Sequence, residues 1–88
     1  RDCDFTRARL MNALLAGSNL RGARLRDAML AGAVLDGANL RGADLTGADL
    51  AATSFRGADL RGAILEGVAR NEDTGFDGAL LDPALQPV

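Results

Sequence analysis

The sequence lacks most of the side chains on which enzyme and metal chemistry depend. It contains no His and no Lys, and its single cysteine, Cys3, cannot form an internal disulfide bond. Without His or Lys to activate them, the Ser and Thr hydroxyl groups are poor nucleophiles. We therefore expect no enzymatic activity, no bound metal and no cofactor. The low cysteine content mildly favours a reducing compartment, and we expect a cytoplasmic location.

Large hydrophobic segments are missing as well. The 88 residues include no Trp, no Tyr and no apolar run long enough to form a transmembrane helix, and residues 1–20 do not resemble a signal peptide. We expect no contact with a membrane. The ten Arg are outnumbered by twelve Asp and Glu, which argues against direct binding of nucleic acid. The length suits one small domain.

The dominant feature that is present is a five-residue repeat. Every fifth residue from Phe5 to Leu65 is Leu or Phe, and the residue two positions before each of them is small. Nine of the thirteen residues two positions after them are Gly. An α-helix would spread these Leu over its whole circumference, and a flat strand would place successive Leu on opposite faces. The repeat therefore predicts a backbone that turns in every pentapeptide and returns each Leu to one interior.

The recurring Gly explains the turn. A type II turn needs a positive φ at its third residue, where Gly has no Cβ to clash. Four corners hold Arg7, Asn12, Asp27 and Ala52 instead. Asn and Asp tolerate left-handed geometry, whereas we expect Arg7 and Ala52 to adopt a different turn type. Cys3 occupies one of the small inward positions, and we expect it to be a core thiol.

The repeat resembles that of the pentapeptide-repeat proteins. The motif A-(D/N)-L-x-x occurs, for example, at residues 38–42 and 43–47, and the pattern runs without a break over residues 3–67. The resemblance implies an all-β fold, a right-handed quadrilateral β-helix with four pentapeptides in each coil. This chain would then form three to four coils with a C-terminal cap.

The repeat register changes near the C-terminus. A core position would fall on Arg70, and the pattern returns one residue later. We divide the chain into a repeat domain of residues 1–67, a bulge or loop of residues 68–73, and a partial last coil with a cap in residues 74–88. Pro83 begins the part that cannot continue a hydrogen-bonded ladder. At the other end the repeat starts without a cap, which predicts either sequence upstream or pairing with a second copy.

The outward residues provide two candidate surfaces. Stacking with the period of one coil aligns Arg21, Arg41 and Arg61, whose like charges repel unless they are paired. Either carboxylates neutralise this column, or it binds an anion or an acidic partner. The carboxylates that we expect to pair with it are Asp36, Asp44 and Asp59.

The second candidate is a protein-contact surface made of outward apolar residues. Such residues are unusual here, because the exterior is otherwise Arg, Asp, Asn and Thr. We expect Leu14 to lie directly above or below Val34. The surface is either a site of self-association or domain contact, or incidental exposure. Its members are Leu14, Val34, Met29 and Ile64, with Met11 as a further outward apolar residue.

These observations favour a non-enzymatic, rigid scaffold or protein-interaction module, whose partner is a protein or a second copy. The resemblance offers an alternative, because some members of the family mimic DNA and bind DNA gyrase or topoisomerase IV, in quinolone resistance or self-immunity. Such mimicry requires a long, strongly acidic rod, whereas the net charge here is only −2. A host-directed or membrane-associated effector domain is a third possibility, although the chain has no lipidation signal and no basic amphipathic stretch.

Overall fold

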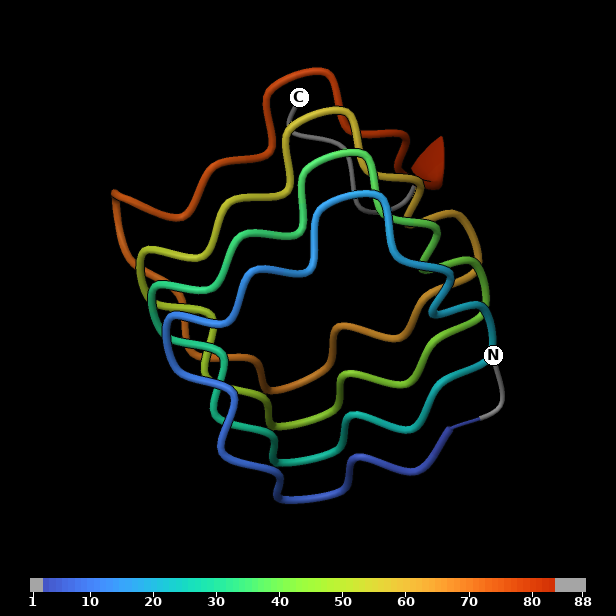
Figure 1. Cartoon of the computed structure of the whole chain (residues 1–88). Helices are drawn as coiled ribbons and strands as arrows, with labels where there is room; N and C mark the ends of the chain where they lie inside the picture. Colours follow the sequence, from blue (N-terminus) through green and yellow to red (C-terminus); the bar gives the residue numbers. More distant parts are fainter. Residues whose placement is uncertain (1–2, 84–88) are drawn as a thin grey trace.

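The backbone winds into a stack of four-sided coils around one central shaft (Figure 1). The computed structural model describes residues 3–83. Within this range, single residues on successive coils form parallel β-bridges instead of long continuous strands. The bridges make four columns, one for each side. The columns are Asp4–Arg24–Asp44–Ile64, Arg9–Met29–Asp49–Ala69, Leu14–Val34–Ser54–Gly75 and Asn19–Asn39–Asp59–Leu80.

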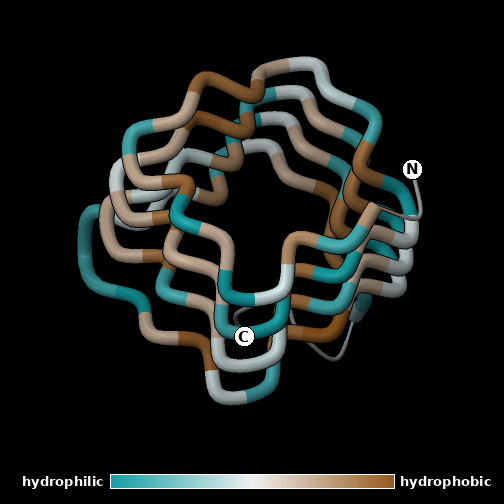
Figure 2. Tube along the Cα trace, turned by 60° about the horizontal axis from the view of Figure 1, so that its bottom comes forward, coloured by the Kyte–Doolittle hydropathy of each residue, from teal (hydrophilic) through white to brown (hydrophobic). Residues whose placement is uncertain are grey.

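Leu, Phe and Ala fill the shaft. Each repeated Leu or Phe from Leu25 to Leu60 is at most 1% exposed, and hydrophobic and polar residues recur at the same places on successive coils (Figure 2). The rings of Phe55 and Phe76 stack with their centroids 5.2 Å apart. The buried hydroxyl group of Thr53 donates a hydrogen bond of 2.7 Å to the Leu30 carbonyl oxygen. The core is therefore apolar, and this polar group within it is hydrogen-bonded.

Backbone hydrogen bonds explain why the motif contains Asp or Asn. Within residues 43–47, the first N–H donates to a carbonyl in the same coil and the second to the preceding coil, while the third and fifth donate to the following coil, at 2.8–3.0 Å. The fourth, on Thr46, donates to Oδ1 of Asp44 at 3.0 Å. The side chain thus accepts the one N–H that the backbone network leaves over. The same bond to the residue two positions later is made by Asp4, Asn19, Asn39, Asp49 and Asp59.

The corners share one conformation whether or not they are Gly. Arg7, Asn12, Asp27 and Ala52 have φ between 56° and 60°, close to the 66–76° of the corner Gly residues. The expectation that Arg7 and Ala52 adopt a different turn is therefore wrong. The ladder imposes this geometry, because the N–H of the corner residue bonds to the next coil, as that of Arg7 does to the Arg26 carbonyl at 2.9 Å.

One extra residue enters the coil between Ala69 and Gly75. Bridges join residues 20 apart as far as Ala69, and 21 apart from Gly75 onward. At this point Oδ1 of Asn71 accepts the N–H of Ala52 at 3.0 Å, where a backbone carbonyl serves most other corners. A side chain therefore replaces the backbone acceptor that the insertion displaces. The predicted cap extends into residues 84–88, which lie outside the described residues.

The strain at Ala52 can be tested by substitution. A Cβ in the left-handed region costs roughly 1–2 kcal/mol, and the greater freedom of Gly in the unfolded chain offsets about 0.4–1 kcal/mol of the gain. We expect Ala52→Gly to raise the free energy of unfolding by about 0.5 kcal/mol, measured by urea denaturation. Ala51→Gly is the matched control, and we expect it to lower that free energy by roughly 0.5–1 kcal/mol, because Ala51 has no positive φ to relieve. Equal destabilisation by the two substitutions would contradict the presence of backbone strain at Ala52.

Candidate functional site

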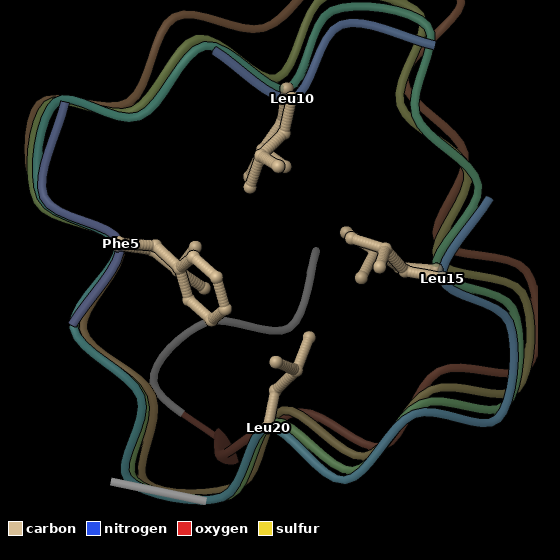
Figure 3. A pocket seen from close by; sticks show the side chains of 7 residues that line it. Phe5, Leu10, Leu15 and Leu20 are labelled. Atoms are coloured by element: carbon tan, nitrogen blue, oxygen red, sulfur yellow. The ribbon is translucent and has the colours of Figure 1, made fainter. Parts of the chain in front are cut away.

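Among residues 3–83, no coil covers the N-terminal side of the first coil, where the shaft begins. Phe5, Leu10, Leu15 and Leu20 point into the shaft from the four sides (Figure 3). Phe5, Leu10 and Leu15 are only partly buried, whereas the core residues on the next coil are at most 1% exposed. These side chains surround an apolar hollow that is partly open to solvent. The full lining is Phe5, Leu10, Leu15, Leu20, Leu25, Leu30 and Leu35.

Cys3 lies on the first coil and is exposed. The expectation of a core thiol is therefore wrong. Its inward position is equivalent to that of Ala23 and Ala43, which are 0% exposed. Those residues have a coil on either side of them, whereas no coil among residues 3–83 covers the outer side of Cys3. Position in the repeat sets the direction of a side chain, and position in the stack sets its burial.

The structure pairs two of the four predicted apolar contact residues, Leu14 and Val34, and places a third, Met29, on the adjacent side. Leu14 is 83% exposed and bridges directly to Val34. Met29 lies on the adjacent side, in the column that includes Arg9, and Met11, which is 46% exposed, follows that side along the chain. We call the surface formed by Met11, Leu14, Met29 and Val34 the apolar corner.

Ile64 does not belong to the apolar corner. It is 44% exposed and bridges to Asp44, in the column that includes Arg24. Arg24 is half a coil from both Leu14 and Val34 along the chain, so Ile64 lies on the opposite side of the β-helix. The four residues therefore do not form one contact surface.

The three arginines lie in register on one edge of the stack. The carbonyls of Arg41 and Arg61 accept the N–H groups of the Gly residues one coil earlier, at 2.9 and 3.1 Å, and all three Arg are exposed. Arg61 is paired with Asp59, with 2.9 Å from Nε to Oδ1 and 2.7 Å from the second guanidinium nitrogen to Oδ2. The Arg21 and Arg41 N–H groups donate to the asparagine side chains two residues earlier. One third of the column is thus neutralised by a direct ion pair that the structure describes.

The expected pairing of this column with Asp36 and Asp44 is wrong. Asp44 pairs with Arg26, at 3.4 Å. Asp36 accepts a 2.5 Å hydrogen bond from the hydroxyl group of Ser54. The side chains of Arg26 and Ser54 reach these two carboxylates instead of the column.

Hydrogen bonds stabilise the ionised form of several carboxylates. The bond from the Arg61 side chain is the main reason that the pKa of Asp59 falls to about 2, and the same bond raises the pKa of Arg61. The pKa of Asp44 is lowered mainly by the hydroxyl group of Thr46. The hydroxyl group of Thr6 has the same effect on the pKa of Asp4. The carboxylates of Asp4, Asp44 and Asp59 are therefore anions at neutral pH in the folded protein.

The Asp59–Arg61 pair predicts a defined pH dependence. Because the folded-state pKa of Asp59 is about 2, below its ordinary value of 3.8, its contribution to stability is complete above pH 3.8 and is lost as the pH falls through 2. We expect the difference in free energy of unfolding between the wild type and Asp59→Asn to shrink as the pH falls from 5 to 2. Urea denaturation across this range measures it. Asp77→Asn, at an exposed carboxylate, is the control, and an equal pH dependence there would contradict the assignment.

Two kinds of site are not found in the part of the chain that the structure describes. Residues 3–83 contain no group of three His, Cys, Asp or Glu side chains placed to hold a metal ion. The same residues include no helix of the length and hydrophobicity needed to cross a bilayer.

A four-sided coil with Leu in its shaft, a left-handed corner in each pentapeptide and a parallel ladder of bridges defines a β-helical repeat protein. The chain belongs to the pentapeptide-repeat family, whose model matches in eight copies over residues 3–42 and 30–67. The resemblance inferred from the sequence is thereby confirmed. Its structural relatives imply that the β-helix is right-handed, as predicted.

Two solved structures illustrate the similarity. The pentapeptide-repeat protein Rfr23 from the cyanobacterium Cyanothece 51142 is 39% identical, with a TM-score of 0.75 over 91% of this chain and 50% of its own. QnrB1 (R167E, trypsin-treated), a plasmid-mediated fluoroquinolone resistance protein, is 24% identical, with a TM-score of 0.76 over 94% of this chain and 39% of its own. This chain thus spans half or less of the length of either protein, and the similarity to QnrB1 shows the fold alone. No protein of curated function matches the sequence.

Proposed function

We propose that this chain is a rigid, non-enzymatic protein-interaction module, and the observation that carries the proposal is the apolar corner. Leu14 is 83% exposed although it bridges directly to the next coil. The residues on either side of Leu14 in the chain are held by backbone hydrogen bonds: the N–H of Leu15 donates to the Val34 carbonyl at 2.8 Å, and that of Ala13 to the Leu10 carbonyl at 3.0 Å. A partner that covers the corner removes apolar surface from water without first having to order the backbone.

The finer architecture is part of the same proposal. We propose three to four coils, a repeat domain of residues 1–67, a loop of residues 68–73, and a last partial coil with a cap in residues 74–88. The change of bridge spacing from 20 to 21 residues between Ala69 and Gly75 supports this division. The absence of His and Lys from the sequence supports a role without catalysis. The cytoplasmic location stays a prediction from the sequence.

The interaction is tested by site-specific crosslinking in the host cell. A photo-crosslinking amino acid placed at position 14 should yield a defined adduct with one protein, identified by mass spectrometry. The same amino acid at position 24, half a coil away on the opposite side, is the matched control. Val34→Asp should abolish the adduct at position 14 while the circular dichroism spectrum stays unchanged. Equal crosslinking at positions 14 and 24, or adducts that survive Val34→Asp, would contradict the proposal.

The charge pattern separates this proposal from DNA mimicry. Residues 3–42 carry six Arg against three Asp, so half of the stack is basic and not acidic. A gyrase-binding DNA mimic needs the opposite charge along its surface. We expect the purified chain neither to inhibit supercoiling by DNA gyrase nor to relieve its poisoning by a fluoroquinolone. Inhibition of supercoiling at micromolar concentration would favour the alternative.

A further inference from the structure

The arginine column contains one guanidinium group that is paired and two that are not. Arg61 forms two hydrogen bonds to the carboxylate of Asp59, at 2.9 and 2.7 Å. Arg21 and Arg41 hold the same position on the two preceding coils, and both are exposed. Among residues 3–83, no ion pair involves either of these two side chains. The column therefore presents two positive charges in neighbouring coils without a carboxylate bound to them.

The residue two positions before each arginine explains this difference. Oδ1 of Asp59 accepts the backbone N–H of Arg61 at 3.2 Å, and the same carboxylate binds the guanidinium group. Oδ1 of Asn19 and of Asn39 accepts the corresponding N–H of the next arginine at 3.3 and 3.1 Å. An amide has the oxygen needed for this backbone bond, but it has no negative charge to pair with Arg. All three coils thus keep the bond that the fold uses, and only the third neutralises its arginine.

The Asp59–Arg61 pair shows what a ligand has to supply at the other two arginines. A carboxylate fits the planar guanidinium group with two parallel hydrogen bonds, which makes this pairing stronger and more selective than that of a point charge. Neighbouring coils lie about 4.8 Å apart, so one short acidic segment can contact both Arg21 and Arg41. The two side chains are on the outside of the coils, where a ligand reaches them from the side of the stack.

The carboxylates closest to the column are already in use. Asp59 binds Arg61, and the charge of Arg41 is the weakest of the causes that lower the pKa of Asp59. Asp82, on the following coil, accepts the N–H of Gly62 at 2.9 Å. Neither carboxylate forms an ion pair with Arg41. The surface around the first two arginines of the column therefore stays positively charged.

We propose that Arg21 and Arg41 bind an acidic segment of a partner protein, with an Asp or Glu carboxylate of the partner on each guanidinium group. The proposal rests on the protein-interaction role proposed above and adds the chemistry of the partner, but it uses a different surface from the apolar corner. The two can therefore fail separately, because crosslinking at position 14 tests the interaction role without involving either arginine.

A titration with a terminally blocked hexaglutamate peptide, followed by heteronuclear NMR, tests this site. The Nε–H signals of Arg21 and Arg41 should shift as the peptide is added, whereas that of Arg61, which is bonded to Asp59, should not. Hexaglutamine should cause no shift, and added salt should weaken the binding of hexaglutamate. Unchanged signals of Arg21 and Arg41 would overturn the proposal. Equal shifts with inorganic phosphate at the same total charge would indicate a site for small anions and would also overturn it.

An exchange of Asn for Asp tests the mechanism without removing an arginine. Asn39→Asp should supply an internal carboxylate to Arg41 and weaken peptide binding about threefold, because one of two exposed pairs is lost. Asp59 holds the equivalent position on the next coil, so the fold accommodates the change. Asn12→Asp is the matched control at a corner elsewhere, where Asn12 and Asp27 share nearly the same φ of 60° and 57°. It changes the net charge equally and should leave binding unchanged, and equal weakening by both variants would show that only net charge matters and that the proposal is wrong.

The reverse exchange should create a third contact. Asp59→Asn releases the guanidinium group of Arg61, so the peptide should bind about threefold more tightly and should now shift the Nε–H signal of Arg61. Asp77→Asn removes the same charge from an exposed residue in another column and should not have this effect. Circular dichroism verifies that each variant folds. If the Arg61 signal of Asp59→Asn does not respond to the peptide, a free arginine in this column does not bind carboxylates, and the proposal is wrong.

Discussion

The left-handed corner that recurs in every pentapeptide is the constraint on which the rest of this structure depends. It returns each Leu to the shaft, and it aims the N–H of the corner residue at the next coil, as at Gly47, which donates to Glu66 at 2.9 Å. The ladder is strong enough to hold Arg7 and Ala52 in the same conformation as Gly. The alignment of successive coils therefore overrides the conformational preference of a single corner residue. A different turn at one corner would displace every core residue after it.

Stacking also decides which residues are buried. In a solenoid each coil contacts only its neighbours, so an inward side chain is fully covered where coils lie on both sides of it. Leu30 is 0% exposed, whereas Leu10, at the equivalent place on the first coil, remains partly exposed. The ends of the stack therefore differ physically from its middle even though the repeat is the same. Partly exposed core residues thus occur on the first described coil without any change of motif.

The sequence predicted well on which side of the backbone a side chain lies, but it predicted poorly which side chains pair with one another. The period placed Leu14 beside Val34, and the pairing follows because backbone register alone determines it. The prediction that Cys3 is buried was wrong because burial depends on the presence of a neighbouring coil and not on the motif. The predicted partner of Asp44 was wrong because a long Arg side chain can reach several carboxylates. The sequence therefore does not show that Arg26 is the residue that pairs with Asp44. Ile64 was assigned to the contact surface because it is hydrophobic. Its residue number, which fixes its place in the coil, puts it on the side opposite Leu14 and Val34.

The position directly after each core residue is free to vary, because neither the ladder nor the shaft uses its side chain. The ladder uses backbone groups and the shaft uses Leu, Phe and Ala, which leaves the position after each core residue unconstrained by packing, as at Arg41 and Ala51. Exposed ion pairs contribute at most about 1 kcal/mol each, so charges on these positions can be rearranged at little cost in stability. The net charge of −2 then says little about the surface, because a basic end and an acidic end cancel in the sum. The distribution of charge has to be followed coil by coil, because neither a single repeat unit nor the net charge of the whole chain contains it.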